Sequence, residues 1–169
     1  MKKNYTRFIV YAAVIAALYA VLTHLQNILL PGSASMAIQM RISEALCVLA
    51  FFTPAAIPGL SIGCLVFNLT FAGTLPLDFL VGTLATYLAA QGMWLTRNLT
   101  VKGYPLLGML LPALTNAILV GWELSVYIGG GFWLNAVYVA IGEAVVLLVL
   151  GTALYYGLKR RSLAEKLFS

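Results

Sequence analysis

Four carboxylates stand within or beside the apolar stretches of this chain, at Glu44, Asp78, Glu123 and Glu143. An ionisable side chain is costly to hold in an apolar environment, so each of these acids is a candidate for function. Carboxylates accept hydrogen bonds from N–H donors and balance positive charge. The acids therefore predict a site for a polar, nitrogen-rich ligand. The alternative is that they cap helices or bind loop backbone.

Amides and aromatic rings accompany the acids. Asn116 lies seven residues before Glu123, so the two side chains share one face of a helix. Aromatic faces would stack on a flat ligand, whereas the alternative for the same rings is a belt at the membrane interface. Besides the acids, the candidate binding residues are Asn68, Asn116, Asn135, Trp122, Trp133 and Tyr138, with Tyr127 as a further ring nearby.

Arg41 lies three residues before Glu44. On a helix this spacing places both side chains on one face, where they can form an ion pair. The alternative is that Arg41 faces the ligand, since ionisable groups inside a membrane are functional candidates by default. An anionic ligand would call for more than one basic residue near the acids, so such a ligand is disfavoured.

Other kinds of chemistry are not indicated. His24 has no second His or Cys ligand close by, so it is interpreted as a hydrogen-bonded structural residue. Cys47 and Cys64 lie in apolar runs and are interpreted as small buried hydrophobes. Neither a Ser-His-acid set nor a phosphate-binding glycine loop is evident. We therefore expect no catalytic residue, no metal, no cofactor and no ATP hydrolysis by this chain.

The composition places these residues in a lipid bilayer. The chain has 169 residues, of which 62% are hydrophobic and 9% charged, with a mean hydropathy of +0.97. Soluble domains carry about 25% charged residues, so we expect an all-α integral membrane protein with one domain over 1–169. Breaks rich in Pro and Gly divide it into six apolar segments. The expected helices cover 8–30, 37–52, 57–72, 77–95, 106–128 and 134–158.

Nine of the ten basic residues fall into three groups, and these groups predict the orientation. Four and then two expected helices separate the groups, so the positive-inside rule puts all three groups and both termini in the cytoplasm. The four acids then lie in the outer half. The net charge of +5 is explained by the basic residues that set the membrane orientation, so no nucleic-acid partner is expected. The groups are Lys2, Lys3 and Arg7, then Arg97 and Lys102, then Lys159, Arg160, Arg161 and Lys166.

The first segment carries small residues at every fourth position, at Ala12, Ala16 and Ala20, with Ala13 and Ala17 on the flanking row. Small side chains at this spacing let a second helix approach closely, so the stripe predicts a docking face. The docked helix belongs either to this chain or to another subunit. The apolar stretch continues past residue 22 without a clear cleavage site, so it is interpreted as a retained helix and not a signal peptide.

Several short stretches carry a family resemblance. They are Arg41-Ile-Ser-Glu-Ala-Leu, Phe51-Phe-Thr-Pro-Ala-Ala-Ile-Pro-Gly-Leu, Leu77-Asp78, Gly82-Thr-Leu-Ala, and Asn116 to Glu123. Together with six apolar segments, the alanine stripe and the missing ATPase motif, they make the chain similar to the substrate-binding S components of energy-coupling factor (ECF) transporters. Within that group the chain resembles the QueT branch, the queuosine precursor transporters.

The resemblance implies a transport module of the bacterial plasma membrane that is not an enzyme. It would bind 7-aminomethyl-7-deazaguanine from outside and release it inside. A membrane coupling subunit and two cytoplasmic ATPases would supply the energy, with Ala12, Ala16 and Ala20 contacting the coupling subunit. The ligand's N–H edge and its aminomethyl cation would each suit a carboxylate, and its carbonyl would suit Arg41 or an amide. Which acid takes which group stays open.

Two rival functions are carried forward. The first is an S component for another vitamin-like small molecule. The second is a stand-alone channel or exporter, for which polar groups along the full depth of the membrane are expected.

Overall fold

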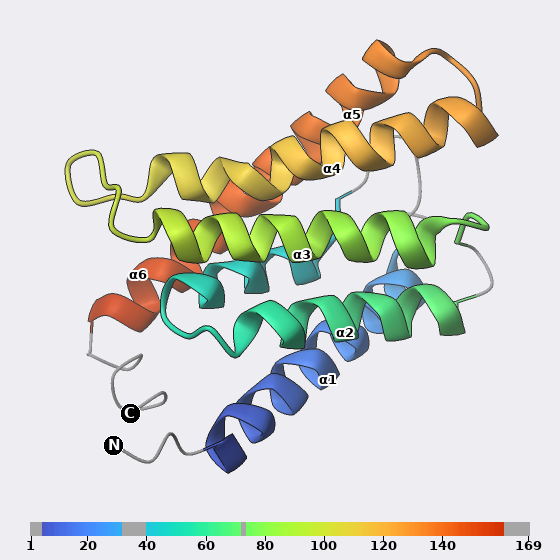
Figure 1. Ribbon diagram of the computed structural model, residues 1–169. Helices are drawn as coiled ribbons and strands as arrows, with labels where there is room; N and C mark the ends of the chain where they lie inside the picture. Colours follow the sequence, from blue (N-terminus) through green and yellow to red (C-terminus); the bar gives the residue numbers. More distant parts are fainter. Residues whose placement is uncertain (1–4, 32–39, 72–73, 161–169) are drawn as a thin grey trace.

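The computed structural model describes residues 5–31, 40–71 and 74–160, which fold into a bundle of helices (Figure 1). The α-helices are α1 (Tyr5–Leu29), α2 (Ala56–Thr70), α3 (Asp78–Thr96), α4 (Leu106–Tyr127), α5 (Phe132–Val146) and α6 (Thr152–Arg160). A 3₁₀ helix, η1 (Ile42–Phe51), precedes α2, and a π-helical turn, η2 (Leu147–Gly151), joins α5 to α6. The helical class expected from the sequence is confirmed.

Three helices in the described part of the chain are long and apolar enough to cross a membrane. They are Tyr5–Leu29, Leu106–Tyr127 and the continuous run Phe132–Arg160. The helices η1 and α2 are apolar but shorter, with 10 and 15 residues. These lengths and compositions support a membrane protein, in agreement with the hydropathy of the sequence.

The expected second helix differs from the observed one. The sequence predicted an α-helix over 37–52; residues 37–39 lie outside the described residues, Arg41 is extended, and the helix from Ile42 is a 3₁₀ helix. A 3₁₀ helix rises about 2.0 Å per residue against 1.5 Å in an α-helix, so ten residues reach about 20 Å instead of 15 Å. The tighter winding lets a short segment extend further through the bundle.

The alanine stripe of α1 packs inside this chain. A Cβ atom at Gly59 would lie 2.8 Å from the carbonyl oxygen of Ala12, and one at Gly63 would lie 2.7 Å from that of Ala16. Both alanines are buried, because α2 approaches α1 through these two glycines. The stripe therefore docks within the chain at Ala12 and Ala16. Ala20 is half-buried, whereas Ala13 and Ala17 on the flanking row are exposed.

The described basic residues outside the carboxylate region gather at one end of the bundle, the left end in Figure 1. Lys159 donates a hydrogen bond to the carbonyl oxygen of Gly103 at 3.3 Å, and the hydroxyls of Tyr104 and Thr152 are 2.6 Å apart. The α3–α4 loop thus lies against α6, and the first turn of α1 is at the same end. The cytoplasmic orientation that the charge groups predict stays a prediction. Lys2, Lys3, Arg161 and Lys166 lie outside the described residues.

An apolar core fills the bundle toward this basic end. Its members come from α1, η1, α2, α3, α4, η2 and α6, and Phe51 and Tyr155 meet edge to face with ring centroids 5.8 Å apart. The buried core residues on this side are Val48, Ala50, Phe51, Met93, Met109, Leu147, Tyr155 and Leu158. The acidic residues lie beyond this core, toward the opposite end.

Candidate ligand-binding site

Every carboxylate and amide that the sequence singled out is buried, with an exposed fraction of 5% or less. They come from helices that pack against one another, and the acids sit in the half of the bundle away from the α3–α4 loop (Figure 1). Burial of so many polar side chains is uncommon in a domain of this size, because a buried polar group that lacks a hydrogen bond loses its hydration and destabilises the fold. The buried set is Arg41, Glu44, Asn68, Asp78, Asn116, Glu123, Asn135 and Glu143.

Arg41 forms its ion pair with Asp78 and not with Glu44. The distance from Arg41 Nη2 to Asp78 Oδ2 is 3.2 Å, and both side chains are almost fully buried. The guanidinium also donates to Cys64 Sγ at 3.8 Å and lies 5.5 Å from the ring centre of Phe67. Of the two alternatives for Arg41, an ion pair with Glu44 on one helix face is not the one observed, because Arg41 has an extended backbone and precedes the helix.

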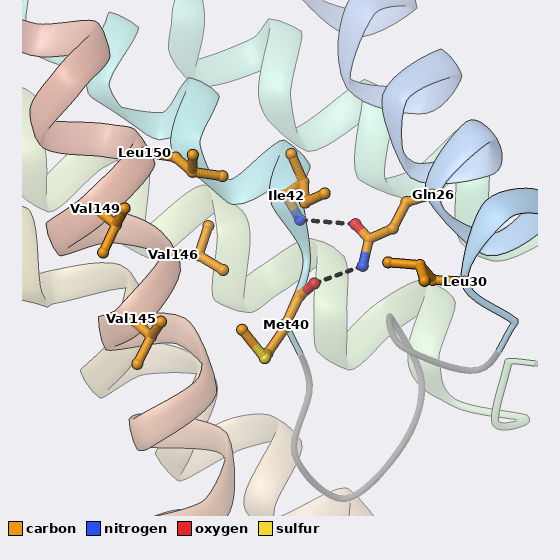
Figure 2. Close-up of a pocket in the computed structure, with 8 residues that line it drawn as sticks. All are labelled: Gln26, Leu30, Met40, Ile42, Val145, Val146, Val149 and Leu150. Carbon is orange, nitrogen blue, oxygen red and sulfur yellow. Dashed lines mark hydrogen bonds between the residues drawn. The ribbon is translucent and has the colours of Figure 1, made fainter.

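Gln26 holds the backbone on both sides of Arg41 (Figure 2). Its side-chain amide donates to the carbonyl oxygen of Met40, and its side-chain oxygen accepts from the N–H of Ile42 at 2.7 Å. These two bonds satisfy backbone groups of the extended segment that leads into η1. Gln26 is therefore a positioning residue for the Arg41–Asp78 pair.

The same region contains a pocket of about 310 Å³ between the end of α1, the start of η1 and the α5–η2 junction (Figure 2). Apart from Gln26 its lining is apolar, so it does not coincide with the carboxylate cluster. The residues that line it are Gln26, Leu30, Met40, Ile42, Val145, Val146, Val149 and Leu150.

Asn68 and Asp78 pack together at the end of α2 and the start of α3. The Asn68 side-chain amide donates to the backbone oxygen of Asp78 at 2.8 Å. Both side chains lie over Gly82, where a Cβ atom would come within 2.8 Å of Asp78 Oδ1 and 2.9 Å of Asn68 Nδ2. A side chain at position 82 would displace them, so the glycine makes room for this polar pair.

Glu44 is held by two donors that the sequence analysis missed. The hydroxyl of Tyr19 donates to Glu44 Oε1, and the thiol of Cys47 donates to Glu44 Oε2 at 3.1 Å. Thr23 supports this arrangement, since its hydroxyl donates to Ser43 Oγ at 2.7 Å and so ties α1 to η1. The signal was present in the sequence: Tyr19, Thr23 and Gln26 form a polar row at helical spacing within an apolar segment.

Glu123 and Glu143 differ from the other two acids. Both oxygens of Glu123, and Oε2 of Glu143, are buried without a hydrogen-bond partner among the described residues. Glu123 lies on α4, which packs against α3 and its Asp78, and Glu143 lies on α5, which packs against η1 and its Glu44. The four acids therefore come from helices that pack against one another inside the bundle.

The remaining amides have different surroundings. Asn116 is buried on the face of α4 that also carries Glu123, as the seven-residue spacing predicted. Asn135 donates from its side-chain nitrogen to the carbonyl oxygen of Gly129 at 2.7 Å. This bond closes the α4–α5 loop, in which Gly129, Gly130 and Gly131 all have positive φ angles. The structure therefore gives Asn135 a role in closing this loop.

The predicted aromatic residues lie mainly outside the buried cluster. Trp122 is 48% exposed and Trp133 is 79% exposed, while Tyr138 is half-buried. Exposed Trp side chains near helix ends are typical of an interfacial belt. The stacking role of these rings remains a prediction.

His24 is hydrogen-bonded, as predicted. Its Nδ1 lies 2.8 Å from the backbone oxygen of Ala20, and its Nε2 lies 3.2 Å from Thr70 Oγ1. Cys47 and Cys64 are free and buried, which agrees with their interpretation as small core residues. Their thiols nevertheless contact Glu44 and Arg41, so they belong to the wall of the polar cluster as well.

The chemistry open to this cluster is the binding of hydrogen-bond donors. Its unpartnered buried atoms are oxygens, and an oxygen acceptor in an apolar bundle gains most from an N–H group or a cation. Among the described residues these atoms are Asn68 Oδ1, Asp78 Oδ1, Glu123 Oε1 and Oε2, and Glu143 Oε2, with Asn27 Oδ1 and Thr83 Oγ1 as further unpartnered atoms.

Comparison with known proteins agrees with the resemblance noted in the sequence. The model of the QueT transporter family matches residues 9–160. A queuosine precursor transporter, QueT, of Lactococcus lactis subsp. cremoris (strain MG1363) is 39% identical over 89 residues, a match that covers 51% of this chain and 48% of that protein. No solved structure matches the chain. On the family model, which covers most of its length, the chain belongs to the QueT transporter family.

Proposed function

We propose that this chain is the substrate-binding S component of an ECF-type importer and that it binds a queuosine precursor, 7-aminomethyl-7-deazaguanine. In this proposal the chain is one domain of six membrane-spanning helices in the bacterial plasma membrane. Both termini are cytoplasmic, and the site opens to the outside. Membrane lipid surrounds the helices. The family and the printed name of the relative support the ligand class.

The unpartnered oxygens of Glu123 and Glu143 are the observation that carries the proposal. A deazaguanine presents ring and exocyclic N–H groups, and its aminomethyl group is a cation at neutral pH. Burying a carboxylate without a partner is costly, and a ligand that supplies N–H donors offsets that cost. The acceptor oxygens of the site are thus complementary to a ligand that is rich in hydrogen-bond donors.

The apolar core at the basic end favours a binding protein over a channel. A channel requires polar groups along the full depth, whereas here Phe51, Met93, Met109 and Leu147 close the bundle below the carboxylates. In this proposal, a ligand that reaches the acids from one side meets this apolar core. The proposal therefore includes a change of orientation or conformation that the partner subunits drive.

Energy coupling in the proposal comes from a membrane coupling subunit and two cytoplasmic ATPases. The resemblance assigned the contact to Ala12, Ala16 and Ala20, but α2 already covers Ala12 and Ala16. We assign the contact to the exposed row of α1 with Ala13 and Ala17, next to Ala20. Small side chains there permit the same close helix packing.

An uptake assay tests the function. Cells that cannot make queuosine are given the labelled base and this chain, with or without a compatible coupling subunit and its ATPases. We expect accumulation only when all components are present. Accumulation by this chain alone would contradict the S-component assignment, and no accumulation under any condition, with the protein in the membrane, would contradict the ligand assignment.

A further inference from the structure

We propose that Glu123, together with Asp78 Oδ1 and Asn68 Oδ1, forms an acceptor-only subsite for a primary ammonium group, so that the protein selects its ligand by positive charge. The inference rests on the proposed function and assigns the four carboxylates that the sequence left equivalent. It follows from which buried oxygens already accept a hydrogen bond or pair with a charge inside the protein and which do not.

Two of the four carboxylates are engaged within the protein. Asp78 Oδ2 pairs with Arg41 at 3.2 Å, and both oxygens of Glu44 accept hydrogen bonds, from Tyr19 and Cys47. Neither side chain is released without leaving a buried charge alone, which is strongly unfavourable. A ligand therefore meets Glu44 as part of the scaffold and Asp78 only through its second oxygen.

The unpartnered carboxylate and amide oxygens near the start of α3 are acceptors only, whereas Thr83 Oγ1 on the same helix is an unpartnered hydroxyl oxygen that can also donate. Asp78 Oδ1 and the Asn68 side chain both lie over Gly82, and the amide nitrogen of Asn68 is bound to the Asp78 backbone, so its Oδ1 is the free atom. Glu123 lies on α4, where its neighbours Val120 and Leu124 pack against Ala85 of α3; it is fully buried, and both of its oxygens are unpartnered among the described residues. An ammonium group has three N–H donors and no acceptor, which matches such a set.

The charge balance of the cluster points the same way. It holds four carboxylates and one guanidinium, so the buried acids outnumber the buried base. In the described residues no group of three or more His, Cys, Asp or Glu side chains is placed to hold a metal ion. An organic cation that brings its own hydrogen-bond donors therefore fits better than a bare ion. Glu143, with one unpartnered oxygen, is left to accept an N–H group from another part of the ligand.

Binding of two ligands to three forms of the protein tests the inference. The ligands are 7-aminomethyl-7-deazaguanine and its neutral 7-hydroxymethyl analogue, which has the same ring and nearly the same size. The proteins are the full chain in detergent, Glu123→Gln, and Glu143→Gln as the matched change on the other carboxylate with an unpartnered oxygen.

The full chain should bind the amine about 10-fold or more tightly than the alcohol. Glu123→Gln should weaken the amine by about 10- to 150-fold, the usual worth of a hydrogen bond between charged groups, and should change the alcohol by about threefold or less. Glu143→Gln should weaken both ligands by a similar factor. Retained affinity for the alcohol also shows that Glu123→Gln is folded.

Three results would overturn the inference: equal affinity of the full chain for amine and alcohol, an equal loss of both ligands in Glu123→Gln, or loss of amine preference in Glu143→Gln alone. If the full chain binds neither deazaguanine, the proposed function itself fails. That outcome is distinct from the other three.

Discussion

Arg41 and Asp78 form a buried ion pair that joins the start of η1 to the start of α3, although the two residues are 37 positions apart. The pair places a positive charge 3.2 Å from one of the four buried carboxylates and so offsets part of the cost of burying that carboxylate. It also fixes the end of η1 that leads to Glu44. The pair is therefore expected to contribute to folding as well as to the shape of the site.

Asp78→Asn should destabilise the unliganded protein by about 3–5 kcal/mol, because it removes the carboxylate that pairs with the buried Arg41 guanidinium at 3.2 Å. Thermal or denaturant unfolding in detergent measures the change. The double variant Arg41→Met/Asp78→Leu removes both charges. Its loss of unfolding free energy should be smaller than the summed losses of the single variants Arg41→Met and Asp78→Leu. Additive effects would show that the ion pair contributes nothing to stability.

Tyr19→Phe should destabilise the protein by about 1.5–3 kcal/mol, since a buried carboxylate loses a hydrogen bond. Tyr127→Phe is the matched control, because this ring is 43% exposed and its change should stay within about 0.5 kcal/mol. The free energy of unfolding without ligand is the quantity to compare. Equal effects of the two substitutions would mean that Tyr19 does not hold Glu44.

Gly63→Ala should destabilise the bundle by about 1–3 kcal/mol, because the added methyl group overlaps the Ala16 backbone and the Tyr19 side chain at 2.7 Å. The same substitution at Gly157, in an exposed position of α6 with no atom near the new Cβ, should stabilise by about 0.5–1 kcal/mol. Melting temperatures of the two variants should move in opposite directions. A stable Gly63→Ala would contradict the close α1–α2 contact.

Ala13→Trp should abolish uptake in cells while the purified protein binds the ligand within a few-fold of normal, because bulk on an exposed helix row prevents another helix from packing there. Ala16→Trp should instead unfold or strongly destabilise the isolated chain, since Ala16 is buried against α2. Cell uptake and binding by the purified variants are measured in parallel. Normal uptake with Ala13→Trp would place the coupling contact elsewhere.

Much of the fold was predictable because a bilayer restricts the choices. Apolar length and Pro-Gly breaks located the helices to within a few residues, as with the expected 106–128 and the observed Leu106–Tyr127. The 3₁₀ winding of Ile42–Phe51 was not predictable, because its apolar sequence is equally compatible with an α-helix. The π-helical turn in the last long helix was missed for the same reason.

The site was predictable in its members but not in its pairs. Ionisable residues in apolar runs identified Glu44, Asp78, Glu123 and Glu143, and all four are buried. Helical spacing gave the wrong partner for Arg41, because tertiary packing brings a residue from another helix closer than a neighbour in sequence. The donors Tyr19 and Cys47 were missed since each also fits an apolar helix face.

Titration calorimetry of the purified chain with 7-aminomethyl-7-deazaguanine, in the absence of any partner subunit, tests the central claim most directly. From the family and the buried unpartnered oxygens together we expect binding at sub-micromolar affinity, which corresponds to about −8 kcal/mol or better. Absence of binding by this base, together with tight binding of an unrelated vitamin, would contradict the ligand assignment.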